Sequence, residues 1–283
     1  MADFHATVVH ELLVRYLDAW TARALHGARA VAYAQLSATG DDAAGAALAA
    51  VRVFAEFADR ARGQAMTVRV ACPDDATAGR VRAALAAEAP ADVTIDVSAR
   101  SQPVLDDNAN VFAYLDHRGE EPPTAATLAA LGERRGLEVL VRGPAVALDA
   151  WAWWASVDLV DRTGSVETVS FGAGDERALT VFKDELWALD EYAGIRYVDP
   201  GDPERTPLDI SLRPALGPLR RAVCARLGEG PLTLGALRTW ALGATIYRAD
   251  DVTRAATELH HNGTVRRDPP GGRLTLATVL SLA

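Results

Sequence analysis

Cysteine is scarce in this chain, and no set of metal-ligating residues stands together. The two cysteines, Cys72 and Cys224, are far apart and in no C-x-x-C spacing, which excludes a disulfide scaffold and a zinc ribbon. The six histidines are scattered and form neither an H-E-x-x-H motif nor a Cys/His cluster. We therefore expect no bound metal and two small, buried, free cysteines.

Long apolar runs are also absent. Arg142 and Asp149 interrupt the most apolar stretch, 137–160, which falls short of the roughly 20 uninterrupted apolar residues of a membrane span. Asp3 and Glu11 break the basic and then apolar layout that a secretory signal needs. The sequence predicts a cytoplasmic protein with no membrane partner.

Positive charge is in short supply overall, but it is unevenly distributed. The net charge of −9 argues against a general nucleic-acid coat. Residues 213–283 carry ten arginines against five acids, a net of +5, so the first 212 residues sum to −14. Four prolines also fall between 200 and 214. Charge and proline together predict a domain boundary near 205–215.

Hydrophobic periodicity predicts alternating helices and strands in the first part of the chain. An amphipathic helix at 6–25 precedes an apolar strand at 30–36, a small-residue loop and a helix at 42–62. Further strands are expected at 67–71, 93–97, 111–115 and 138–141, with helices at 76–87 and 125–134. This order predicts an α/β domain over 1–175, with a mainly parallel sheet covered on both faces. Such sheets bind ligands at the carboxyl ends of their strands, here the loops at 37–45, 72–75 and 116–122.

The later part of the chain predicts a different kind of domain. Two late strands, 157–160 and 166–171, lead into a helix at 176–193, and 176–212 forms a connecting segment. Residues 213–283 have the element order of a winged helix. The expected elements are helices at 214–227, 233–242 (capped by Thr233) and 250–262, and a β-wing made of 265–267, a turn at 268–272, and 273–276.

Four segments, in this order, resemble the three-Cys-motif partner family (TcmP). The opening helix, ELLVRYLDAW from Glu11, looks like that of the family. The run VFAYLDHRG from Val111 is similar to its F-x-F-I-D-P-F-G strand end, and FKDELW from Phe182 to its M-K-D-A-M-W segment. TIYR from Thr245 falls where the family has T-x-Y before the last helix. The resemblance covers most of the chain.

The resemblance implies a Rossmann-like, class I methyltransferase-type domain that uses S-adenosylmethionine. It would hold the cofactor in the loop after the first strand, with a carboxylate after the second strand on the adenosine ribose. Asp116 ends an apolar strand, where catalytic residues of this architecture usually stand, and would orient a nucleophile. His117, which replaces the family's proline, would accept the proton of that nucleophile. The implied cofactor-binding residues are Gln35, Ser37, Thr39, Gly40, Asp74 and Asp75.

This chain departs from the family pattern in the cofactor loop. Gln35 stands where the family has an acid, and Thr39 stands where it has a glycine that bends freely. Three hypotheses follow. The first is methyl transfer to an unknown small-molecule or macromolecular nucleophile, and the second is a non-catalytic or repurposed partner protein that binds another protein or a second copy. The third is a transcription regulator that senses a ligand in its Rossmann domain. An open pocket with Asp74 or Asp75 pointing into it favours the enzyme, whereas Tyr33 or Arg118 filling it favours the partner protein.

Two other features have competing interpretations. Lys183 and Asp184 could orient a substrate, but an exposed ion pair on a docking helix is the commoner use of such residues and is the interpretation we favour. The candidate recognition helix, 250–262, carries three acids against Arg254 alone, which disfavours DNA despite the basic character of this part of the chain.

Overall fold

The computed structural model describes residues 4–39, 43–61, 63–99, 105, 108–119, 121–190 and 194–283. The chain folds as two compact units. The first comprises Met1–Trp154 and Glu167–Val181, and the second comprises Ala155–Val166 and Phe182–Ala283. The charge and proline boundary expected near 205–215 therefore falls inside the second unit.

The first unit is built on a mostly parallel sheet, as the alternation of elements predicts. Its strands follow the order β3-β2-β1-β4-β5-β7, and β7 alone runs antiparallel to its neighbour β5 within this set. The strand bounds are β1 (Ala30–Gln35), β2 (Ala65–Cys72), β3 (Val93–Ala99), β4 (Asn110–Asp116), β5 (Leu137–Gly143) and β7 (Val166–Ala173).

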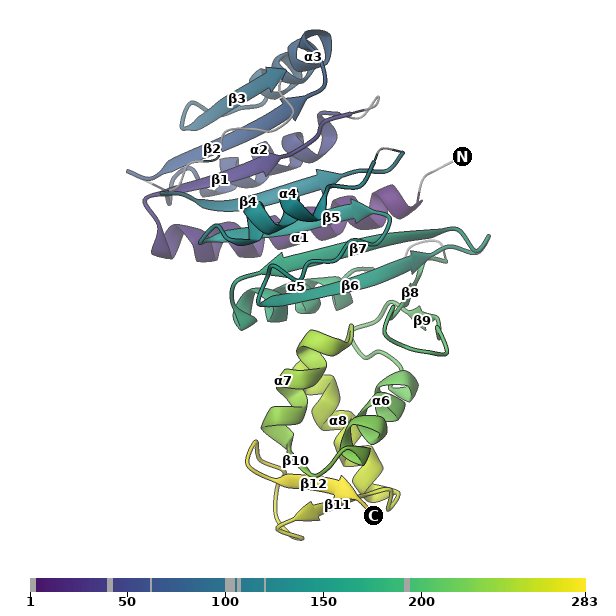
Figure 1. Cartoon of the computed structure of the whole chain (residues 1–283). Coiled ribbons are helices and arrows are strands. Elements are labelled where there is room, and N and C mark those ends of the chain that lie inside the picture. Colours follow the sequence, from purple (N-terminus) through teal and green to yellow (C-terminus); the bar gives the residue numbers. More distant parts are fainter. Residues whose placement is uncertain are drawn as a thin grey trace. The chain divides into compact units, whose positions relative to one another are not determined.

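Neighbouring residues of a strand point to opposite faces, so these buried strands place apolar side chains on both faces of the sheet. Helices cover both faces. The helices are α1 (Phe4–Gly27), α2 (Gly45–Phe57), α3 (Asp75–Ala86) and α4 (Ala125–Gly132) (Figure 1). On one face, Phe112 of β4 contacts the rings of Tyr16 and Trp20 of α1. On the other, Leu128 and Leu131 of α4 pack on the aliphatic side chains of β1, β4 and β5.

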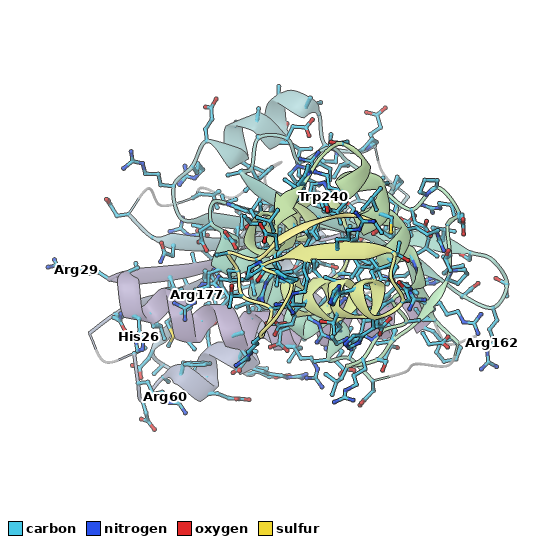
Figure 2. The ribbon with its side chains drawn as sticks, turned by 90° about the horizontal axis from the view of Figure 1, so that it is seen from below. His26, Arg29, Arg60, Arg162, Arg177 and Trp240 are labelled. Carbon is cyan, nitrogen blue, oxygen red and sulfur yellow. The ribbon has the colours of Figure 1, made fainter. Side chains whose placement is uncertain are left out.

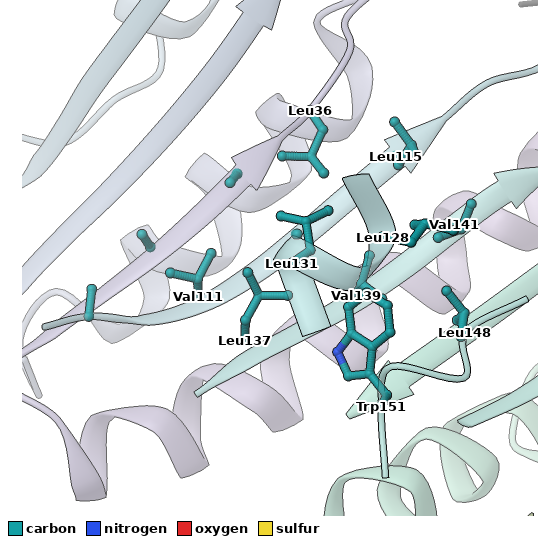
Figure 3. Packing of buried hydrophobic residues seen from close by; sticks show 14 residues of the cluster. Leu36, Val111, Leu115, Leu128, Leu131, Leu137, Val139, Val141, Leu148 and Trp151 are labelled. Carbon is teal, nitrogen blue, oxygen red and sulfur yellow. The ribbon is translucent and has the colours of Figure 1, made fainter. Parts of the chain in front are cut away.

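The core under α4 is shown in Figure 3. It joins Leu36, Val111, Leu115, Val139 and Trp151, which are at most 8% exposed. Burial of a large aliphatic side chain stabilises a fold by about 1.5–3 kcal/mol. This cluster therefore fixes the strand ends of β1, β4 and β5 relative to one another.

The second unit contains β6 (Trp153–Val160), which pairs antiparallel with β8 (Arg196–Val198), and β8 pairs in turn with β9 (Leu208–Asp209). Helix α5 (Glu176–Trp187) begins in the first unit and ends in the second. The C-terminal elements are α6 (Gly217–Gly228), β10 (Leu232–Thr233), α7 (Leu234–Ala244), α8 (Ala249–His261), β11 (Val265–Asp268) and β12 (Val279–Leu282). A small antiparallel sheet has the order β10-β12-β11.

Several of the expected elements differ. Helix α2 spans Gly45–Phe57 and not 42–62. The last strand is β12, not the expected 273–276, because Leu280 is the side chain that enters the core, whereas Leu276 is 59% exposed. The backbone of 276–278 instead accepts hydrogen bonds from the start of α7, where Gly235 N donates to the Leu276 carbonyl at 2.8 Å. Helix α5 ends at Trp187, six residues before the expected end.

Candidate functional site

The carboxyl ends of the parallel strands meet at one edge of the sheet in the first unit. Gln35 ends β1 and lies beside Tyr114 of β4, and Asp116, which ends β4, lies beside Arg142 of β5. The sequence therefore predicted correctly which residues share this edge. Whether they form a site depends on what each side chain binds.

Gln35 is turned inward and is 4% exposed. Its amide Nε2 donates to the Ala43 carbonyl at 3.0 Å, and its Oε1 accepts from the Tyr33 hydroxyl at 3.5 Å. Gln35 thus ties the end of β1 to the residue two before α2. An acid at this position would accept hydrogen bonds from a ligand, whereas this amide donates to the chain itself.

The rest of the expected cofactor loop is partly described. Ser37 and Thr39 are half-buried, and the Ala38 N–H donates to the Ala71 carbonyl of β2 at 2.9 Å. Gly40 lies outside the described residues.

Asp74 caps helix α3. Its carboxylate accepts from the Thr77 N–H at 2.7 Å and from the Thr77 hydroxyl at 3.1 Å. The hydrogen bond from the Thr77 backbone lowers the pKa of Asp74 below its usual value. Asp75 occupies the first turn of the same helix and is exposed. Asp74 therefore has a structural role as the cap of α3, and a ribose would have to share its carboxylate with Thr77.

Asp116 belongs to a cluster of two arginines and two acids at this edge. It accepts from Arg118 Nη2 at 2.8 Å and Nε at 3.0 Å, and Arg142 Nη1 lies 3.7 Å away. Arg142 also donates through Nε to Glu167 of β7 at 2.5 Å. Formal charges in the cluster cancel, and Arg118 lies over the carboxylate expected to orient a nucleophile.

His117 is 2% exposed and sits against the end of β5. Its backbone N–H donates to the Arg142 carbonyl at 3.0 Å. Its imidazole lies so close to Gly143 that a Cβ at that position would be 2.9 Å from both Cε1 and Nε2. A general base must reach the proton it accepts, and this ring faces backbone instead.

Arg142 and Glu167 were not among the expected site residues. Arg142 is 5% exposed in a strand that is buried throughout. A charged residue inside an apolar strand needs a partner, and that rule was the available signal. The sequence could not identify Glu167 as the partner, because it lies 25 residues later, on β7.

The expected exposed ion pair at Lys183 and Asp184 is wrong. Lys183 is fully buried and lies in the second unit, where its Nζ donates to the carbonyls of Leu242 and Thr245, each at 2.5 Å, and of Tyr247 at 3.1 Å. Burial lowers the pKa of Lys183 to about 7. This amine closes the C-terminal end of α7, where carbonyls lack intrahelical partners.

The second unit has its own hollows. One cavity of about 390 Å³ lies among α6, α7 and the segment 199–204. Trp240 of α7, which is labelled in Figure 2, is half-buried and lines this cavity. A groove of about 770 Å³, the α8 groove, lies between α8 and the segment 272–276. Its lining residues are Leu234, Arg238, Asp250, Thr253, Arg254, Thr257, His260, His261, Arg267 and Gly272–Leu276.

Several simple chemistries find no support in the described residues. No three His, Cys, Asp or Glu side chains there are grouped so as to hold a metal ion. Cys72 is a buried free thiol, whereas Cys224 is only half-buried. Of the helices in the described ranges, none has the length and apolar character to cross a membrane.

No protein family, curated protein or solved structure matches this chain.

Proposed function

We propose that this chain is a non-catalytic binding protein, built on a methyltransferase-type Rossmann scaffold and a C-terminal winged-helix module. One observation carries the proposal: the strand-end side chains suited to a cofactor and substrate are bound to the chain's own groups. Gln35 holds the Ala43 carbonyl, Asp74 caps α3, and Asp116 is bound by Arg118.

The two parts of the scaffold are inferred from topology. The order β3-β2-β1-β4-β5 follows that of Rossmann sheets, and the reversed strand β7 beside β5 is typical of methyltransferase-type sheets. The order α6-β10-α7-α8-β11-β12, with β12 central in its sheet, supports a winged helix. The resemblance to TcmP proteins agrees with both.

Energetics favour the binding protein over the enzyme. Asp74 already accepts from the Thr77 N–H and hydroxyl, which leaves fewer of its lone pairs for a ribose. A substrate at Asp116 would have to displace a charge-assisted, two-point hydrogen bond from Arg118. That displacement costs interaction energy before any ligand contact forms.

Methyl transfer from S-adenosylmethionine is the second candidate. Ser37 and Thr39, half-buried at the end of β1, favour it because their hydroxyls lie in the loop that would hold the cofactor. The acceptor would be a small-molecule or macromolecular nucleophile.

Thermal unfolding with cofactor tests the proposal. A ligand present at about 100 times its Kd stabilises a protein by about 2.7 kcal/mol, which moves Tm by several degrees. We expect millimolar S-adenosylmethionine and S-adenosylhomocysteine to leave Tm unchanged. A rise of several degrees that disappears in Asp74→Ala would instead establish the cofactor site and the enzyme.

A further inference from the structure

We infer that the α8 groove of the second unit binds duplex DNA through its phosphate backbone. The inference deepens the proposed binding function by naming a partner. It rests on that function only in part, because the groove lies outside the strand-end site.

Charge is the first argument. Four arginines and one aspartate line the α8 groove, namely Arg238, Arg254, Arg267, Arg273 and Asp250, for a net charge of +3. DNA carries one negative charge per roughly 1.7 Å of helix axis, and neutralising its phosphates releases counterions. The negative charge of the rest of the chain repels DNA only weakly, because salt at about 0.1 M screens charges beyond about 10 Å.

Of the three acids of α8, Asp250 alone lines the groove, although the sequence predicted a helix too acidic for DNA. Asp251 is 1% exposed and accepts from Arg248 Nε at 3.0 Å. Glu258 does not line the groove and is bound by Arg220. Asp250 does line it but is paired with Arg238 at 2.8 Å. The net charge of α8 sums the residues on all its faces, whereas DNA phosphates would contact one face only.

The groove face of α8 offers groups that suit phosphate. Thr253 and Thr257 line the groove one turn apart, and Arg254 and His260 stand on the same lining. The Thr257 hydroxyl donates to the Thr253 carbonyl at 2.7 Å, and Arg254 donates to the Pro214 carbonyl at 3.0 Å and lies 3.7 Å from Asp251, so a phosphate would share Arg254 with these groups. Hydroxyls and guanidinium groups supply many of the contacts that proteins make to DNA phosphates. The opposite wall is the segment 272–276, which brings Arg273 to the groove.

Arg267 holds that wall in shape. Its guanidinium donates to the carbonyls of Pro269 at 3.1 Å, Gly271 at 2.7 Å and Gly272 at 2.9 Å. Neutral carbonyls do not cancel its charge, and an arginine stays protonated in proteins. Arg267 therefore orders the turn between β11 and β12 and also adds to the positive potential of the groove.

Fluorescence anisotropy of the full chain with a labelled duplex of about 20 base pairs tests the inference at about 50 and about 200 mM NaCl. We expect saturable binding that weakens steeply with salt. Arg273→Glu and Thr257→Glu, which place a carboxylate in the groove, should each weaken binding about tenfold or more and flatten the salt dependence.

Arg266→Glu is the matched control. Arg266 is the neighbour of Arg267 on β11, is exposed and does not line the groove. The substitution Arg266→Glu therefore makes the same charge change as Arg273→Glu, but on the other face of the strand. It should weaken binding less than about twofold. Circular dichroism of each variant checks folding, and Arg273→Gln replaces Arg273→Glu if the latter unfolds.

Three results would overturn the inference. They are no binding at low salt, equal losses in all three variants, or tighter binding of single-stranded RNA or an acidic peptide than of the duplex. If the chain binds neither DNA nor S-adenosylmethionine, only this inference is overturned. If it binds S-adenosylmethionine and still binds DNA, only the proposed function is overturned.

Discussion

Lys183 is the only lysine in the chain, and its burial makes it a sensitive probe of the second unit. Burial disfavours the ammonium form and lowers the pKa of Lys183 from 10.5 to about 7. Between these values the unfolded chain binds more protons than the folded chain, so the free energy of unfolding should rise with pH in that window.

NMR of the chain labelled at its single lysine gives this pKa directly. We predict a midpoint near 7 for the folded protein and near 10.5 after denaturation. Lys183→Met should lose the rise in unfolding free energy between these values, which a urea series at several pH values measures. A folded-state midpoint above 10 would refute the lowered pKa.

Gly143 tests the packing of His117. Its φ of +139° is unfavourable for any side chain, and a Cβ there would lie 2.9 Å from the imidazole. Gly143→Ala should therefore destabilise the first unit by about 1–3 kcal/mol in urea unfolding. Gly164→Ala is the control, because Gly164 also has a positive φ, +84°, and nothing lies within 4 Å of its Cβ position. Equal effects of the two substitutions would mean that His117 moves aside freely.

At the scale of elements, the cap of α7 was predictable because it depends on local sequence, whereas α8 is capped at Arg248 and not at Asp250 or Asp251. Thr233 caps α7 by accepting from the Ala236 N–H at 3.1 Å. Thr233→Ala should lower the free energy of unfolding by about 1 kcal/mol, whereas Thr233→Ser, which keeps the hydroxyl, should change it little. Chemical denaturation measures both, and a Ser variant as weak as the Ala variant would show that the cap does not matter.

Long-range partners were harder to predict than elements. Short apolar runs and alternating apolar residues predicted every strand from β1 to β5, because such patterns are local. Apolar residues at 273–276 and at 279–282 suited the last strand comparably, and only the burial of Leu280 decides between them. The same holds for Lys183, whose carbonyl partners lie about 60 residues away in the sequence.

At the scale of the whole molecule, the sequence predicted which residues reach the strand ends, whereas their hydrogen-bond partners needed the structure. Position follows from topology, since parallel strands end at one edge. Role follows from the partner of each polar atom: the Ala43 carbonyl for Gln35, Thr77 for Asp74, and Arg118 for Asp116. Two of these partners are within four residues in sequence, so short-range capping and turn rules could have suggested them.

The central claim is that these internal bonds replace a cofactor. Calorimetric titration of the full chain with S-adenosylmethionine and S-adenosylhomocysteine tests it most directly, with Arg118→Ala as the variant that frees Asp116. We predict no binding heat for the wild-type chain at millimolar ligand. Saturable micromolar binding that Asp74→Ala or Asp116→Ala abolishes would contradict the claim and make the chain a methyltransferase.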